Sequence, residues 1–359
     1  MLQAYRDKAL AEKAAKAIRK LAPEGKIKFM HVCGTHEQTI TRFGLRSLLP
    51  ENIEIIPGPG CPVCVTPAKD IDIAIELAKQ GKTIAIYGDM FRVPGSRSSL
   101  NKEKAKGGDV RIVYSIRDAV KLAREHKDKE VVFFSIGFET TAPTVASEIL
   151  SSPPENFSIL TSHRLIPPVM ELLLGIGDFE IKGWICPGHV ATIIGVKAFR
   201  IFPEVYGMPT VIAGFEPLDV LLALVMLLKQ VKKKEPKAEN EYSRVVTEEG
   251  NLKAQKMMNE VFEVCDENWR GIGKVPNSAL KLKKEFSEYD AREKFDVEVE
   301  EAIDVLPGCS CHLVIVGKLK PEQCPMFGKK CTPSSPHGPC MVSQEGTCNI
   351  AYKYGDHKK

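Results

Sequence analysis

Short apolar, β-branched runs recur along the chain and alternate with segments that have helical periodicity. Successive runs start roughly 26 to 30 residues apart within each half, a spacing typical of strand-plus-helix units in a parallel α/β fold. The runs that we expect to form strands begin near Lys26, Asn52, Lys82, Asp109, Glu130, Asn156, Gly183 and Pro209. The helices that we expect between them include residues 68–80, 117–125 and 216–229.

Four units followed by a second set of four predict the fold class α/β, with two similar parallel-sheet domains and a C-terminal helical or irregular domain. A single eight-unit barrel is the alternative, which the restart of the pattern near Glu130 disfavours. After Val231 the sequence becomes charged, and we expect helix up to Leu280 with a loop at 268–278. The predicted divisions are an N-terminal helix at 1–25, α/β domain I at 26–127, α/β domain II at 128–235 and a C-terminal domain at 236–359.

Composition narrows the class of protein. The 359 residues include 50 basic and 46 acidic side chains that form no long basic tract, so we expect no nucleic-acid partner. No charged-then-apolar leader opens the chain and no apolar run reaches about eighteen residues, so we expect no membrane span and a cytoplasmic location. In that reducing compartment, eleven cysteines indicate metal or redox chemistry rather than structural disulfides.

Six cysteines crowd the last part of the chain, where regular periodicity is weak. Four of them are separated by six, eight and seven residues, and a Cys-Ser-Cys triplet precedes them: Cys324, Cys331, Cys340 and Cys348, after Cys309 and Cys311. Four thiolates hold a [4Fe-4S] cluster or a tetrahedral zinc ion. Zinc sites usually use paired CxxC knuckles, which this segment lacks, so we favour the cluster over zinc and over unligated thiols. Cys311 is an alternative to Cys340 as a ligand.

Polar, glycine-rich turns follow the predicted strands, at the sheet edge where parallel α/β proteins bind ligands. One such turn contains Cys61-Pro-Val-Cys64 before a predicted helix. A CxxC at a helix start has a lowered thiolate pKa and can form a reversible disulfide. We therefore predict a redox-active pair with exposed sulfurs; half of a zinc site is the alternative.

A second turn, Cys33-Gly34-Thr35-His36-Glu37, places a thiol and an imidazole three residues apart. One interpretation is a nucleophilic cysteine with histidine as its base. Another is a soft-metal site with Cys33 as ligand and His36 nearby, and a third is a half-buried cysteine beside a capping threonine. The neighbouring CPVC turn disfavours the third interpretation.

Other polar residues at the same edge are weaker candidates. Glu139 and Thr140 open a predicted helix, and His189 lies in a CPGHV turn, so each is either a helix cap or a cleft residue. We expect Cys186 to be partly buried and inert, and Cys265 to be a core residue of a helix.

Taken together, six motifs resemble the HypD family of hydrogenase maturation factors over essentially the whole chain. They are HVCGTHE, GPGCPVCVTP, GFETTAPT, CPGHV, NWRGIGKVPNSAL and CPMFGKKCTPSSPHGPCMVSQEGTC. The resemblance implies two α/β domains and a C-terminal [4Fe-4S] domain. It also implies a scaffold that, with the small protein HypC, carries a transient Fe(CN)2CO group, with cyanide delivered by HypE from a thiocyanate.

The resemblance assigns roles by motif. Cys33 would bind the iron together with a HypC cysteine, His36 would support it, and Cys61 and Cys64 would be the redox pair. Gly34, Thr35, Glu139, Thr140 and His189 are the candidate residues that bind the iron group, because amides at glycine-rich turns can donate hydrogen bonds to cyanide nitrogen. We expect a monomer when no partner is bound.

Two other functions remain open. One is a cluster-dependent thiol–disulfide reductase of a protein partner, which explains the CPVC turn and the tail but not CGTHE. The other is a zinc-stabilised adaptor without redox chemistry. A radical enzyme that uses S-adenosylmethionine is disfavoured, because the chain has no CxxxCxxC triplet.

Overall fold

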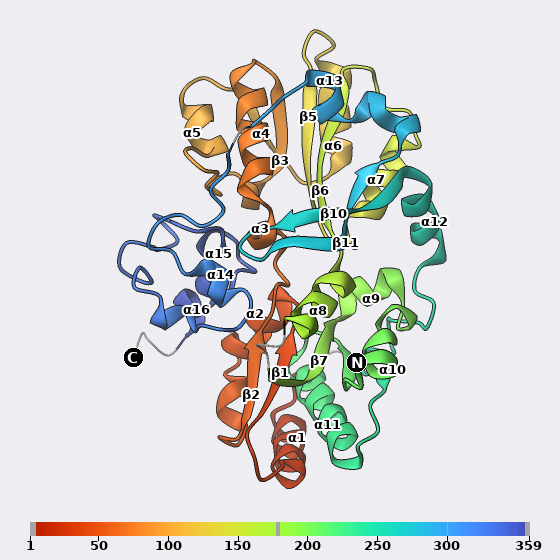
Figure 1. Ribbon diagram of the computed structural model, residues 1–359, viewed down its shortest axis with the longest axis vertical. Coiled ribbons are helices and arrows are strands. Elements are labelled where there is room, and N and C mark those ends of the chain that lie inside the picture. The colour runs from red at the N-terminus through yellow and green to blue at the C-terminus, as the bar shows by residue number, and fades with distance from the viewer. Residues whose placement is uncertain (1–4, 177–179, 300, 356–359) are drawn as a thin grey trace.

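A computed structural model of the protein describes residues 5–176, 180–299 and 301–355. Its strands form two sheets, one above the other in Figure 1. The first α/β unit, below, has the strand order β2-β1-β7-β8-β9, and all its pairs are parallel. The strands are β1 (Ile27–His31), β2 (Ile53–Pro57), β7 (Ile181–Pro187), β8 (Thr210–Ala213) and β9 (Ala238–Asn240). The helices around them are α1 (Lys8–Leu21), α2 (Gly34–Arg42), α8 (Ile166–Gly175), α9 (Gly188–Ile194), α10 (Ile201–Tyr206) and α11 (Pro217–Lys233).

The second α/β unit has the strand order β10-β11-β6-β5-β3-β4. Its strands are β3 (Thr83–Tyr87), β4 (Val110–Val113), β5 (Val131–Gly137), β6 (Phe157–Arg164), β10 (Phe262–Trp269) and β11 (Gly273–Leu282). The first four are parallel to one another, whereas β11 and β10 extend the sheet as an antiparallel hairpin. The helices of this unit are α4 (Ala68–Lys79), α5 (Leu100–Ala105), α6 (Ile116–Glu125), α7 (Ala142–Ile149), α12 (Leu252–Val261) and α13 (Ala291–Phe295).

The predicted fold class is confirmed, and all eight expected strands are present. The predicted helix near 216–229 begins at Pro217, where proline fits the first helical position and Asp219 accepts a hydrogen bond from the Glu216 amide. The N-terminal helix is described from Lys8 to Leu21 and starts after Asp7, whose side chain caps it; the expected helix residues before position 5 lie outside the described part.

The predicted domain boundaries are wrong, because each sheet takes strands from both halves of the chain. β1 pairs with β7, about 150 residues later, and β3 pairs with β5 rather than with β1 or β2. The segment after residue 236 also belongs largely to the two α/β units, since β9 joins the first sheet and the β10–β11 hairpin joins the second. The chain therefore crosses between the two units several times before it reaches the tail.

The stretch expected to be helical up to Leu280 is instead the short helix α12 followed by the β10–β11 hairpin. Phe262 pairs with Leu282 and Trp269 pairs with Gly273, so the predicted loop at 268–278 contains the hairpin turn and most of β11. Cys265 accordingly lies on a strand and is only half-buried, not in a helix core. Cys186, expected to be partly buried, is fully buried in β7.

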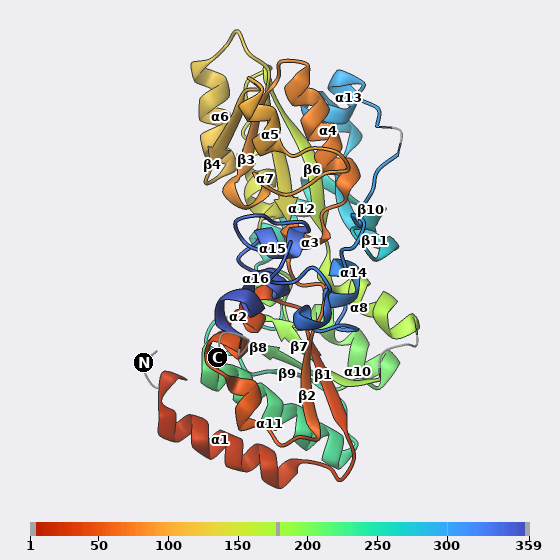
Figure 2. The same cartoon turned by 90° about the vertical axis from the view of Figure 1, so that its left-hand side faces the viewer.

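The cysteine-rich tail packs between the two units, against α2 and α3 (Pro62–Val65) (Figures 1 and 2). Its helices are short: α14 (Cys311–Val314), α15 (Pro339–Val342) and α16 (Thr347–Tyr354). A single apolar cluster joins the tail to both sheets and includes Met30 of β1, Val65 of α3 and Met341 of α15. The tail is thus part of the common core rather than an appended segment.

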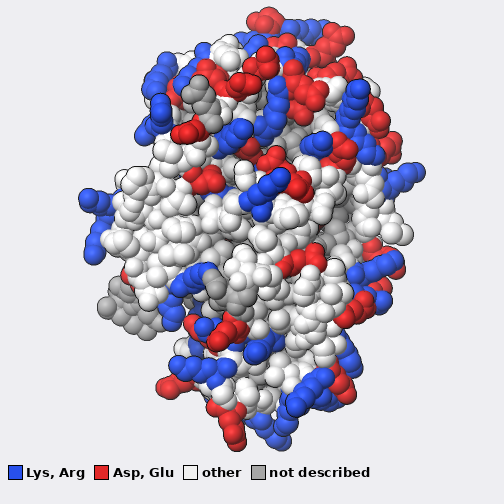
Figure 3. All heavy atoms as spheres, viewed as in Figure 1, with Lys and Arg blue, Asp and Glu red and all other residues white. Residues whose placement is uncertain are grey.

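Charged side chains of both signs are interspersed at the two ends of the molecule, whereas the central band of the face in Figure 3 is mostly uncharged. Among the described helices, none combines the length and the apolar character that a bilayer crossing requires. The most apolar long helix, α11, is instead a core helix that buries Val220, Leu221 and Leu224.

Candidate functional site

Three N-terminal cysteines meet where strands β1 and β2 end. The two strands are parallel neighbours with His31 opposite Pro57, so the turns that follow them lie side by side. The Gly34 amide donates to the Gly60 carbonyl at 3.1 Å, and a side-chain carbon on Gly60 would lie 2.1 Å from the Cys33 nitrogen. Glycine at position 60 therefore permits the close approach of the two turns.

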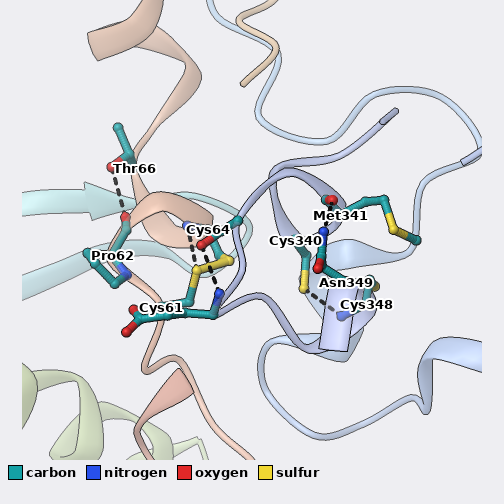
Figure 4. Close-up of a disulfide and its surroundings, with 10 residues drawn as sticks. Cys61, Pro62, Cys64, Thr66, Cys340, Met341, Cys348 and Asn349 are labelled. Atoms are coloured by element: carbon teal, nitrogen blue, oxygen red, sulfur yellow. Dashed lines mark hydrogen bonds between the residues drawn. A yellow bond between two sulfur atoms is a disulfide. The ribbon is translucent and has the colours of Figure 1, made fainter. Parts of the chain in front are cut away.

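Cys33, Cys61 and Cys64 line one crevice together with His31 and Glu345. Its volume is about 10 Å³, roughly the space that a single water molecule needs. Cys61 and Cys64 form a disulfide, and the Cys64 amide donates to Cys61 Sγ at 3.1 Å (Figure 4). The crevice thus holds two free thiols, Cys33 and Cys340 of the tail, beside one oxidised pair.

The expectation that the sulfurs of the Cys61–Cys64 pair are exposed is wrong, and Cys33 is buried as well. Cys33, Cys61 and Cys64 are 8 %, 7 % and 1 % exposed, respectively. The cover comes from the tail, because α15 packs on α3 and Glu345 lies against the Cys33 turn. A reagent the size of a protein therefore reaches these sulfurs only if the tail moves.

Cys33 is a protonated thiol in this environment. Burial, and then the nearby Glu345 carboxylate, raise the pKa of Cys33 to about 12. The backbone amides of Thr35 and His36 donate toward the sulfur and partly oppose this rise. Thr35 also donates from its hydroxyl to Glu345 Oε1 at 3.2 Å, and a side chain at Gly34 would collide with Glu345, so α2 and the tail are fitted together here.

His36 is fully buried, and its hydrogen bonds define its tautomer. Nε2 lies 2.9 Å from the Gly214 carbonyl oxygen, which can only accept, so Nε2 carries the proton. Nδ1 has no partner among the described residues. Burial, and then the neighbouring His31, lower the pKa of His36 to about 3, so the ring is neutral. A neutral imidazole with one nitrogen held and the other free is the form that binds metals.

A buried ion-pair network beneath the crevice was not assigned a role from the sequence. Glu37 Oε2 lies 2.8 Å from His31 Nε2 and 2.7 Å from Arg46 Nη2. Burial opposes the charge on Glu37, but Arg46 and His31 outweigh it and lower the pKa of Glu37 to about 2. The HVCGTHE motif contains both His31 and Glu37. His31 ends a predicted strand and Glu37 lies in the first turn of the following helix, and this spacing could have predicted that the two side chains meet.

The other candidates lie in different places. His189 is exposed at the start of α9 and stacks on Phe215 at 3.8 Å, and His36 stacks on the same ring at 5.0 Å. Glu139 and Thr140 follow β5 in the second unit, and neither belongs to the described lining of the cysteine crevice. Glu139 is buried, accepts from the Ile166 amide at 2.9 Å, and has its pKa raised to about 7 by burial.

All six tail cysteines line a second cavity: Cys309, Cys311, Cys324, Cys331, Cys340 and Cys348. Met326, Phe327 and Met341 make much of the rest of its wall. Three sulfurs accept backbone hydrogen bonds: Cys309 from the Cys311 amide at 3.4 Å, Cys331 from the His337 amide at 3.3 Å, and Cys340 from the Cys348 amide at 3.2 Å. Within the described residues, no three metal-binding side chains converge on one position for a single ion.

These residues fit an iron–sulfur cluster. A cluster takes thiolate ligands, an apolar surround and amide hydrogen bonds to sulfur, and the tail cavity supplies all three. A cluster is also larger than one ion, so its ligands need not converge on a single point. The six thiols leave the choice of four open. Figure 4 shows Cys340 and Cys348 on the tail elements beside the Cys61–Cys64 disulfide.

The fold and the site define a class: an α/β protein in which a CxxC disulfide and the free Cys33 share a crevice under a cysteine-rich tail. The HypD family model, described as the hydrogenase formation hypA family, matches residues 9–355. The chain therefore belongs to the HypD family of hydrogenase maturation factors.

Relatives match over nearly their whole length. A putative hydrogenase expression/formation protein of Methanocaldococcus jannaschii is 52 % identical over 353 residues, which cover 97 % of this chain and 98 % of the relative. Hydrogenase maturation factor HypD2 of Bradyrhizobium diazoefficiens is 47 % identical, with 99 % and 97 % covered. HypD of Azotobacter vinelandii is 43 % identical, with 99 % and 97 % covered.

Proposed function

We propose that this hydrogenase maturation factor is the scaffold on which an Fe(CN)2CO group is assembled, with HypC as the partner that shares the iron and HypE as the source of cyanide. The observation that supports this most directly is the single crevice that contains Cys33 and the Cys61–Cys64 disulfide. Iron with cyanide and CO ligands is the substrate here. An iron-binding thiol and a two-electron thiol pair are the two functions that its assembly needs in one place.

Cys33 is the proposed iron ligand of this chain, and His36 is the proposed supporting residue. Iron that carries CO and cyanide is soft, so a thiolate suits it. Binding the iron displaces the proton from the Cys33 thiol, which burial otherwise retains. His36 offers Nδ1, because the Gly214 carbonyl holds Nε2–H. The amides of Thr35 and His36, which already point toward the Cys33 sulfur, are suited to stabilise negative charge there.

Cys61 and Cys64 are the proposed electron donors. Release of cyanide from a thiocyanate breaks the sulfur–carbon bond and requires two electrons, which leave a thiolate and a cyanide ion. Oxidation of the Cys61–Cys64 dithiol to a disulfide provides two electrons and two protons, so the step balances. The disulfide in the structure then corresponds to the pair after it has delivered its electrons.

Four of the six tail cysteines would hold a [4Fe-4S] cluster, which would supply electrons one at a time to restore the dithiol. This order of electron transfer agrees with the order of the cysteine cavities. The tail cavity, the disulfide and Cys33 follow one another from the tail to the end of β1. A cytoplasmic location is part of this proposal, because thiols in both sites must be reduced to work.

The test is maturation activity of cysteine variants. Cys61→Ala or Cys64→Ala is expected to leave the visible absorbance of the cluster intact and to abolish maturation of a [NiFe]-hydrogenase. Cys265→Ala is the matched control, because this half-buried cysteine lies on β10 outside both described cysteine cavities. Normal maturation with either CPVC variant would show that the pair is not the electron donor.

A second candidate function is a cluster-dependent thiol–disulfide reductase, which the disulfide beside the tail favours. Its weakness is access, because Cys64 is 1 % exposed and a partner protein must reach one sulfur of the pair. A zinc-stabilised adaptor is a third possibility for the same tail. Metal analysis separates the adaptor, since zinc without iron in anaerobically purified protein favours it.

A further inference from the structure

Arg270 lies in the turn between β10 and β11 and is only 3 % exposed. Its backbone amide donates to the Val65 carbonyl at 2.9 Å, one residue beyond the disulfide. Its guanidinium donates from Nε to the Asp304 backbone carbonyl at 2.7 Å and from Nη1 to the Pro94 carbonyl at 2.8 Å. One residue therefore connects the CPVC helix, the start of the tail and the loop after β3.

This buried cation has no carboxylate within ion-pair distance among the described residues. Asp304 offers only its backbone oxygen, since its side chain accepts from the Ala68 amide. Asp72, the other nearby carboxylate, accepts from Ser96. By contrast, Arg164, which is equally buried, pairs with Asp70. Asp304 and Asp72 act on the guanidinium without forming an ion pair with it. A buried charge without a paired carboxylate is costly, so the surroundings of Arg270 are suited to a further anion.

Three cysteines share a small cavity with this arginine. Arg270 and Gly271 line it together with Cys64 of the disulfide and with Cys309 and Cys311 of the tail.

The hairpin turn is fitted closely against the tail at this point. Gly271 has a φ of +75°, and a side-chain carbon there would lie 2.7 Å from His312 Cβ, so the turn needs glycine to approach. The close packing of Gly271 against the tail thus fixes the position of Arg270 near the disulfide and the tail.

We propose that Arg270 is a positioning residue that supplies the buried positive charge for an anionic, sulfur-ligated group held by the tail cysteines, and that it thereby favours reduction of that group. The inference rests on the proposed iron–sulfur function. Adding one electron from a reductant makes the group more negative by one charge and moves no proton. A fixed cation beside it stabilises the reduced form more than the oxidised form.

The test is the midpoint potential of anaerobically purified full-length protein, followed by visible absorbance during reduction with dithionite. Arg270→Gln removes the charge and keeps a hydrogen-bond donor. It is expected to lower the equilibrium constant for one-electron reduction roughly tenfold, which corresponds to about 59 mV toward more negative potential. Arg270→Lys retains the charge and is expected to stay within about threefold of the wild type.

Arg164→Gln is the matched control, because it removes an equally buried arginine that pairs with Asp70 away from the cysteine cavities. Its potential is expected to equal that of the wild type. Leu306→Lys adds a positive charge at a half-buried position on the wall shared with Arg270 and is expected to raise the equilibrium constant roughly threefold. This variant tests whether positive charge on the cavity wall changes the midpoint potential, even if Arg270→Gln does not fold.

The outcomes separate the two proposals. Iron-containing Arg270→Gln protein with a wild-type potential overturns the role of Arg270 and leaves the proposed function standing. The same holds if Arg270→Gln does not fold and Leu306→Lys leaves the potential unchanged. Wild-type protein that contains no iron when purified anaerobically overturns both proposals.

Discussion

Replacing Glu37 by glutamine tests the ion-pair network beneath the crevice. Glu37 is 4 % exposed and is held by both His31 and Arg46. A pKa of about 2 in place of the ordinary 4.5 corresponds to about 3 kcal/mol of stabilisation at neutral pH. Glutamine keeps the shape of the side chain but loses the charge, so Glu37→Gln is expected to lower the free energy of unfolding by about 3 kcal/mol at pH 7.

The pH dependence has a definite sign. The folded-state pKa of Glu37 lies below its unfolded value, so the stabilisation is complete above pH 4.5 and disappears as the pH falls toward 2. The difference between wild type and Glu37→Gln should therefore be largest near neutral pH and shrink below pH 4.5. The measurement is urea denaturation followed by circular dichroism at several pH values between 3 and 7.

Glu125→Gln is the control, because Glu125 forms an exposed pair with Lys121 at 3.8 Å. Such a surface pair contributes about 0–1 kcal/mol, so this variant should denature close to the wild type. If Glu37→Gln changes the unfolding free energy at pH 7 by no more than the control does, the network does not carry the stability assigned to it. An equal loss of unfolding free energy in Glu37→Gln at pH 3 and at pH 7 would contradict the predicted pH dependence.

Three more predictions concern single residues of the two units. Gly60→Ala should destabilise the protein by about 1–3 kcal/mol in urea, because the added carbon would overlap the Cys33 nitrogen. Alkylation of Cys33 by iodoacetamide, measured by mass spectrometry, should be slow at pH 8 and rise about tenfold per pH unit to pH 10, because the pKa of this thiol is about 12. Burial raises the pKa of Glu139 to about 7, so the wild-type protein loses stability as the pH rises from 4.5 through 7. Glu139→Gln should therefore stabilise the protein at pH 8 by up to about 3 kcal/mol and have little effect near pH 4.

Each of these has a control and a contrary result. Gly25→Ala is the control for Gly60→Ala, since nothing lies within 4 Å of the added carbon; equal stability of the two variants would contradict the close-approach argument. A Cys33 alkylation rate that levels off by pH 9 would show that the thiol has an ordinary pKa. Glu139→Gln with lower stability than wild type at pH 8 would mean that the carboxylate is ionised and compensated in the folded protein.

The strands were predictable because their local pattern is strong. Runs such as 130–137 are apolar and β-branched, and β5 is buried along its whole length. Sheet membership was not predictable from the same pattern, because both sheets are built from the same kind of unit. β1 joins β7 through packing of chain segments far apart in sequence, and no local signal indicates that pairing.

The β10–β11 hairpin was missed for a different reason. In β10 only Phe262 and Trp269, at its two ends, are buried, so the strand lacks the two-residue alternation of a half-buried strand. Pairing with β11 and β6, rather than its own pattern, gives the segment its structure.

At the site, sequence motifs placed the cysteines on neighbouring turns, and the structure brings them together. Their burial could not be predicted, because Glu345, which covers the Cys33 turn, lies about 310 residues away in the chain. The carbonyl of Gly214 that accepts from His36 lies just after a strand end, 178 residues along the chain from His36. The residue types in each turn can thus be read from the local sequence. The burial of the cysteines, the tautomer of His36 and the pKa values depend on tertiary contacts.

The central claim is that Cys33 carries iron in the crevice that it shares with the Cys61–Cys64 pair. Infrared spectroscopy of this protein purified anaerobically in complex with HypC tests it most directly. The wild-type complex is expected to show bands in the cyanide and CO stretching regions, and the Cys33→Ala complex is expected to lose them while the tail retains its iron. Bands of full intensity in the Cys33→Ala complex, or their absence from a wild-type complex that contains iron, would contradict the account.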